Sequence, residues 1–195
     1  MAKGINKNMK DIIYKNVPII TKRLCIKKIT AEELILIRGE TSEDFYKMTC
    51  RPVIKREKNE LEELYKNMIQ RDNTVIFSII RKKDGALIGK VSLSDYNPRN
   101  SSMELGYNII PRYRKNGYMS EALTNLFDVL FGIIGLNKIY AQTASFNAES
   151  IGLLKKMNFK KDAILREHHE LDGKLYDDYI FSMLCKEWEC LHNSK

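Results

Sequence analysis

A change in hydrophobic period at mid-chain limits the possible folds of this sequence more than any other feature. Between residues 74 and 110 apolar side chains recur at every second position, which indicates β-strands. The segments TVIFSIIR and ALIGKVSLSDY, joined by the turn KKDG, predict a β-hairpin in which Gly85 supplies a positive φ. A third strand, SSMELGYNII, ends at Pro111. After Gly117 the spacing becomes helical, so we expect a sheet with a helix packed against it.

That helix is the best defined in the sequence, because its apolar residues form one stripe. The stripe consists of Met119, Ala122, Leu123, Leu126, Leu130 and Ile133. Three more helices are predicted: AEELILIR, with Thr30 and Glu33 as a capping box, KNELEELYKNMIQRD and NAESIGLLKKM. Further strands are predicted at RLCIKKI, KIYAQTAS, AILREHHEL and LYDDYIFSMLC. The order βααβββαβαββ predicts an α/β (α+β) fold with a mixed sheet and helices on both faces.

Composition predicts one domain, since 195 residues at 44% apolar content can bury one sizeable core. No linker-like or repetitive tract divides residues 1–195, and the lysine-rich ends, about 1–18 and 189–195, are expected to be flexible. No apolar run is long enough to span a membrane. The four cysteines form no CxxC pair, so neither disulfides nor a zinc site is expected, and the protein is predicted to be cytoplasmic.

The net charge of +8 favours an anionic partner, and the sign alone leaves nucleic acid, acidic lipid and phosphorylated ligands open. The lysines are scattered and aromatic residues do not interleave with them, so nucleic acid is not expected. One basic cluster stands out in RYRKNGYMSEAL, residues 112–123. A helix N-terminus preceded by Gly117 and by basic side chains can bind phosphate, although a solvated turn has the same composition. Neither GxxxxGK[ST] nor GxGxxG occurs.

The stretch from Arg114 to Met119 resembles the signature of the GNAT superfamily of acyl-CoA-dependent N-acetyltransferases, which is Gln or Arg, two residues, Gly, one residue, then Gly or Ala. Met119 stands where the family has a small residue. Four other stretches occur along the chain in the order that the family shows: TKRLCIKKITAEEL, GALIGKVSL, NAESIGLLKKMNF and REHHELDGKLYDDYIFSMLCKEW. The resemblance therefore covers about residues 20 to 188. It is closest to the branch of ribosomal-protein N-terminal alanine and serine acetyltransferases.

The resemblance implies a mostly antiparallel central sheet of about seven strands with about four helices. It also implies that acetyl-CoA is the co-substrate, held by its pyrophosphate on the loop before the helix, and that the pantetheine arm enters where two strands separate. The residues that it assigns to the cofactor are Ile109, Ile110, Arg112, Arg114, Lys115, Asn116, Gly117, Tyr118, Met119, Ser120 and Asn147.

Transfer of acetyl from a thioester to an amine needs a base for the amine and a proton for the departing thiolate. By the resemblance, Glu104 is the candidate base, directly or through water, and a carboxylate on the polar side of its strand is the alternative. By the resemblance, Ser150 stands where the ribosomal-protein branch carries a serine near the sulfur, so it is the candidate acid, while Leu154 replaces the tyrosine that many relatives use. The alternative explanation is structural, since Asn147 is a good N-cap and Glu149 favours the helix dipole. Glu167, His168 and His169 are reserve candidates. Adjacent strand residues point apart, so no metal site is predicted.

The sequence thus predicts an acetyl-CoA-dependent N-acetyltransferase in which a primary amine attacks the thioester directly in a ternary complex, without a metal. The amine is a protein N-terminus or a small molecule, and the two stay open. The alternative function is a non-catalytic acyl-CoA-binding sensor or interaction protein with the same fold. A monomer or homodimer without a membrane partner is expected.

Overall fold

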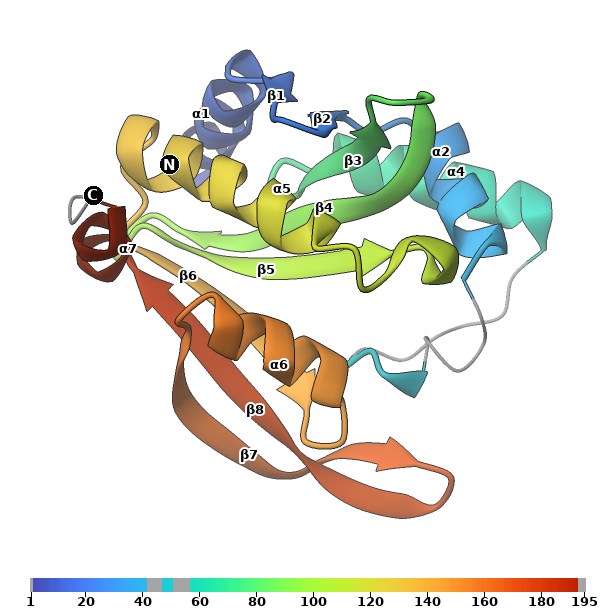
Figure 1. The fold of residues 1–195 in the computed structure, drawn as a ribbon, viewed down its shortest axis with the longest axis vertical. Helices are drawn as coiled ribbons and strands as arrows, with labels where there is room; N and C mark the ends of the chain where they lie inside the picture. Colours follow the sequence, from blue (N-terminus) through green and yellow to red (C-terminus); the bar gives the residue numbers. More distant parts are fainter. Residues whose placement is uncertain (1, 42–46, 51–56, 193–195) are drawn as a thin grey trace.

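The centre of the molecule is an eight-stranded sheet in the order β1-β2-β3-β4-β5-β6-β8-β7 (Figure 1). The computed structural model describes residues 2–41, 47–50 and 57–192. The strands are β1 (Ile19–Ile20), β2 (Leu24–Lys28), β3 (Val75–Arg81), β4 (Ala86–Asn97), β5 (Ser102–Ile109), β6 (Lys138–Ala144), β7 (Lys160–Leu171) and β8 (Lys174–Leu184). The helices are α1 (Ala2–Lys15), α2 (Ala31–Gly39), α4 (Lys58–Gln70), α5 (Tyr118–Phe127), α6 (Ala148–Lys156) and α7 (Cys185–His192).

The predicted mixed fold is confirmed. The strand beyond the roughly seven that were predicted is the two-residue β1, which pairs with β2. The predicted hairpin forms from β3 and β4, with Gly85 at a φ of 69° in its turn. Thr30 and Glu33 make the predicted capping box at the start of α2. A six-residue π-helical turn, Asp128–Ile133, extends α5.

Alternation along the strands divides the sheet into two faces. Phe77 belongs to the core under α1 and α5, whereas its neighbour Ile76 packs with α2 and α4 on the other side. We call these sides the α5 face and the α2 face. Helix α6 lies on the α5 face, where Leu154 is fully buried, and Figure 1 shows α5 and α6 on the same side of the sheet. The two faces matter because the candidate site residues divide between them.

Both chain ends carry helices where flexible ends were expected. In α1, Ile13 is 1% exposed and the Tyr14 ring meets Phe77 edge-on at 5.9 Å between centroids. In α7, Trp188 packs edge-on against Phe127 at 5.4 Å. A few large apolar side chains therefore anchor segments that are otherwise rich in charge, while residues 193–195 lie outside the described part of the chain. Among the described helices, none is long and apolar enough to cross a membrane.

The two parallel strands at the centre of the sheet separate along their length. Strand β5 pairs with β6 at three positions, Ser102 to Lys138, Met103 to Ile139 and Glu104 to Tyr140. Beyond Glu104, β5 continues to Ile109 and β6 to Ala144 without pairing to each other. Figure 1 shows the strands diverging toward the end at which α5 begins. The divergence that the family resemblance implied is thus present.

Candidate active site

The loop before α5 has the geometry of an anion site. Gly117, at a φ of 75°, is the N-cap of α5 and supplies no side-chain cap, so N–H groups of Tyr118, Met119 and Ser120 remain as first-turn donors. Lys115 also has a left-handed φ, of 60°. A Cβ placed on Gly117 would come no closer than 3.6 Å to another group, the Arg23 guanidinium, so the space over this glycine is open.

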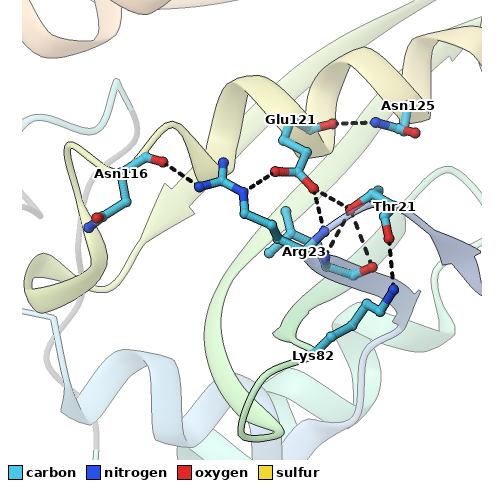
Figure 2. A network of polar contacts seen from close by, with 7 residues as sticks. Thr21, Arg23, Lys82, Asn116, Glu121 and Asn125 are labelled. Atoms are coloured by element: carbon cyan, nitrogen blue, oxygen red, sulfur yellow. Dashed lines mark hydrogen bonds and ion pairs between the residues drawn. The ribbon is translucent and has the colours of Figure 1, made fainter.

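A network of polar contacts holds this loop against the start of the sheet (Figure 2). Arg23 donates through Nε to Glu121 Oε2 at 2.5 Å and through Nη1 to the Asn116 carbonyl at 3.0 Å. The hydroxyl of Thr21 donates to Glu121 Oε1 at 2.6 Å. The Arg23 guanidinium also lies over the Tyr118 ring, 4.6 Å from its centroid. Arg23 is a site residue that sequence reasoning missed, because it is 93 positions from its partner in the loop.

The predicted basic residues have different roles in this structure. Arg114 donates through Nε to the Ile109 carbonyl at 3.1 Å and contacts Glu149 at 3.3 Å, so it joins the end of β5 to α6. Arg112 pairs with Glu40 and lies over the Tyr113 ring. Lys115 is exposed beside the open side of the loop.

Three of the predicted cofactor residues have buried side chains: Ile109, Ile110 and Met119. Their side chains therefore offer little exposed surface to a cofactor. The Ile110 N–H already donates to the Ile88 carbonyl at 2.9 Å, so this amide is not available as a donor, in contrast to the first-turn amides of α5. Asn147 caps α6 by accepting from the Ser150 N–H at 3.1 Å, which leaves its carboxamide nitrogen as the donor.

Ser150, the candidate acid, lies on the α5 face of the strand divergence. Its hydroxyl is 2.8 Å from that of Tyr107, which projects from β5. Burial raises the pKa of Tyr107 to about 12, in spite of the opposing effect of the bond to Ser150, so the phenol keeps its proton at neutral pH. The Tyr107 hydroxyl is a second group that the sequence did not assign, because its proximity to α6 depends on the topology.

Glu104, the candidate base, lies on the opposite face of the sheet. It is half-buried at the last paired position before the divergence, beside Tyr140 on β6 and across from Ser94 on β4. Since side chains alternate along a strand, Glu104 points to the α2 face and Tyr107 to the α5 face. Glu104, the candidate base, and Ser150, the candidate acid beside Tyr107, thus lie on opposite sides of the gap in β5–β6 pairing.

The burial of the reserve candidates does not follow the simple alternation that would place Glu167 and His169 on one face, because the β7–β8 register shifts between Leu165 and His169. Glu167 and His168 are exposed, whereas His169 is buried, 7% exposed. Glu167 has a φ of 50° where the β7–β8 register shifts. The exposed pair lies away from Glu104 and Ser150 in the register of the sheet, so neither joins the candidate site.

Comparison with known proteins agrees with this geometry. Residues 23–160 match the family model described as an acetyltransferase (GNAT) domain. An uncharacterized N-acetyltransferase, p20 of Bacillus licheniformis, is 35% identical over 57% of this chain and 63% of its own length. Another, YoaA of Bacillus subtilis, is 27% identical over 84% of this chain and 94% of its own.

Two further relatives carry names that specify an acceptor. YdaF of Bacillus subtilis, named provisionally as a ribosomal N-acetyltransferase, is 27% identical over 54% of this chain and 58% of its own length. The solved spermidine N-acetyltransferase of Vibrio cholerae, in complex with coenzyme A and spermine, superposes with a TM-score of 0.76 at 21% identity over 86% of this chain and 99% of its own.

The fold and the site define a coenzyme A-dependent acyltransferase. The chain belongs to the GNAT acetyltransferase family. Membership in the ribosomal-protein branch has only the distant likeness to YdaF in its favour, so the finer assignment stays a prediction.

Proposed function

We propose that this protein transfers the acetyl group of acetyl-CoA to a primary amine by direct attack in a ternary complex. The observation that supports this most strongly is the end of β5–β6 pairing at Glu104, close in sequence to the loop whose amides would bind pyrophosphate. The pantetheine arm would enter this gap, with the thioester between Glu104 on one face and Ser150 on the other.

In this proposal Glu104 accepts the amine proton, directly or through a water molecule, as the nitrogen forms its bond to the carbonyl carbon. The carbon–sulfur bond then breaks, and Ser150 donates a proton to the thiolate. The Tyr107 hydroxyl keeps its proton, donates a hydrogen bond to Ser150 and so orients it, and the proton that Glu104 takes from the amine balances the one that the thiolate gains. No metal takes part in the transfer step. The separation of base and acid on opposite faces matches an amine that arrives on one side and a thiolate that leaves on the other.

The acceptor is a protein N-terminal α-amine or a small-molecule amine; the name of YdaF specifies a ribosomal acceptor, and that of the Vibrio enzyme specifies spermidine. We also propose a cytoplasmic location, consistent with four unpaired cysteines. The monomeric or homodimeric state and the absence of a nucleic-acid partner stay predictions.

The test is release of coenzyme A thiol from acetyl-CoA in the presence of two acceptor sets: peptides with N-terminal Ala or Ser, and amines such as spermidine. We expect acceptor-dependent release with one set, together with a rise in melting temperature on addition of acetyl-CoA or coenzyme A but not ATP. A melting shift without thiol release from any acceptor would instead support the non-catalytic sensor.

A further inference from the structure

A second polar cluster lies on the α2 face of the sheet, and the proposed transfer does not use it. Cys50, His169 and Asp178 each offer one ligand atom, and these atoms all lie within 4.8 Å of one another. They come from the segment 47–50, from β7 and from β8. The sequence did not predict the cluster, because Cys50 is more than 100 positions from the other two residues and has no ligand spacing to them.

Asp178 supplies the observation that a ligand is required. The residue is 0% exposed, and its Oδ2 accepts from Gln142 Nε2 at 2.6 Å. Its other oxygen, Oδ1, accepts no hydrogen bond of normal geometry from any residue that the structure describes. A buried carboxylate is strongly unfavourable without compensation, and the Cys50 thiol beside this carboxyl group is only a weak hydrogen-bond donor, so Oδ1 is suited to a cation.

The tautomer of His169 determines what faces that oxygen. Its Nε2 is 2.9 Å from the Lys47 carbonyl, and because a carbonyl only accepts, Nε2 carries the hydrogen. In the neutral ring, Nδ1 therefore presents a lone pair to Asp178 Oδ1, 3.3 Å away. Two lone pairs repel at this distance unless a proton or a cation lies between them. A histidine whose second nitrogen donates to a backbone carbonyl is the usual arrangement of a metal ligand.

The spacing fits a metal ion better than a hydrogen bond. Zinc bonds of about 2.0 to 2.3 Å place tetrahedral ligand atoms about 3.3 to 3.6 Å apart. The His169 to Asp178 separation of 3.3 Å already has this value, although the contact lacks hydrogen-bond alignment. The Cys50 sulfur lies within 4.8 Å of the other two ligand atoms, so it needs to approach by at most about 1.3 Å to complete three ligands.

We propose that Cys50 Sγ, His169 Nδ1 and Asp178 Oδ1 bind one divalent cation of the zinc class, with the fourth position taken by water. Thiolate, imidazole and carboxylate together are a ligand set that zinc accepts. The ion would join the segment 47–50 to the β7–β8 hairpin on the side of the sheet that holds Glu104. This site departs from the expectation of a metal-free protein, and it does not depend on the proposed transfer mechanism.

The experiment measures the zinc content of the purified full-length chain and then titrates metal-free protein with Co²⁺. We expect one ion per chain and a near-ultraviolet sulfur-to-cobalt absorption band. Loss of one outer-shell partner already weakens metal binding about 10- to 100-fold, so Cys50→Ser should abolish the band and weaken binding by at least that factor. Cys25→Ser, which removes a half-buried thiol of β2, is the matched control and should retain both.

A chelator should lower the melting temperature of the wild type and leave that of Cys50→Ser unchanged, because only the former loses a ligand. The thermal transition of each variant also reports whether it is folded. Wild-type protein that binds no zinc and shows no sulfur–cobalt band would overturn the proposal. The proposal would also be overturned if Cys50→Ser bound the metal as tightly as the wild type, or if the band were lost only when the exposed Cys190 is replaced. Either result would indicate adventitious binding.

Discussion

The hydroxyl of Tyr107 lies 2.8 Å from that of Ser150, and this contact joins β5 to α6 across the place where β5 and β6 separate. Burial raises the pKa of this phenol to about 12, so it keeps its proton and can donate a hydrogen bond to Ser150. The relatives' tyrosine position is Leu154 here, which is fully buried in the core. A tyrosine from a strand thus supports the serine at the place where the leaving sulfur would be protonated.

Replacing Ser150 by alanine removes the group nearest the leaving thiolate in the proposed site. We expect kcat to fall about 100-fold, the range of general acid catalysis, with little change in the affinity for acetyl-CoA. Thiol release and calorimetry measure the two quantities. Ser145→Ala is the matched control, since its backbone N–H, rather than its hydroxyl, bonds to Asp177. Unchanged kcat in Ser150→Ala would contradict a role of the serine hydroxyl in the transfer, since the cap contact uses the backbone N–H that alanine retains.

Tyr107→Phe retains the ring and deletes only the hydroxyl. The lost hydrogen bond is worth about 0.5 to 1.5 kcal/mol, so kcat should fall at most about tenfold. If Tyr107 acts through Ser150, the double variant should be no slower than Ser150→Ala. Strictly additive losses in rate would show that the two hydroxyls act independently.

Glu104→Gln tests the base. The amide cannot accept the amine proton, so kcat should fall about 100-fold. Glu63→Gln on the exposed side of α4 is the control for loss of one negative charge. A wild-type kcat in Glu104→Gln would transfer the role to another group.

Arg23→Met removes the donor that ties the Asn116 carbonyl and Glu121 to β2. Because the loop then loses its fixed geometry, we expect the KM for acetyl-CoA to rise roughly tenfold, equivalent to about 1.4 kcal/mol. The control is Lys66→Met, which removes an exposed helical ion pair worth about 0.2 to 0.5 kcal/mol. A KM equal to wild type in Arg23→Met would separate this network from cofactor binding.

The same network gives stability a pH dependence. Burial tends to raise the pKa of Glu121, but hydrogen bonds from Thr21 and Arg23 outweigh it, and the net pKa is lowered. A carboxyl group with a lowered folded pKa stabilises the protein above its unfolded pKa, about 4.3, and the contribution is lost as pH falls through the folded value. Urea unfolding between pH 3 and 6 should show a smaller acid-induced loss in Glu121→Gln than in wild type.

Much of the fold could be predicted because local patterns dominate it. The hairpin turn at Gly85, the cap at Thr30 and the stripe on α5 all depend on residues close in sequence. The terminal helices were missed, since lysines set the composition there while a few residues such as Ile13 and Trp188 supply the packing. In these segments tertiary burial outweighs the local pattern.

The candidate site, like the fold, contains some residues that the sequence predicts and others that it does not. Gly117 and the first-turn amides of α5 belong to one contiguous motif, so the sequence alone predicts that the glycine precedes the helix and that these amides lie in its first turn. Arg23, Tyr107 and the cluster around Asp178 depend on pairing between distant strands. Periodicity assigns such a residue to a face of its own strand, but only the sheet order determines which residue lies opposite.

The central claim is that the loop around Gly117 binds the pyrophosphate of acetyl-CoA, and calorimetric titration of two glycine variants tests it most directly. Gly117 and Gly85 have similar φ values, 75° and 69°, and an added Cβ has room at both. Alanine should therefore destabilise the fold by about 1 to 2 kcal/mol at either position. We predict that Gly117→Ala weakens acetyl-CoA binding at least tenfold while Gly85→Ala binds like wild type. Equal affinity in the two variants would contradict the assignment of this loop to the cofactor.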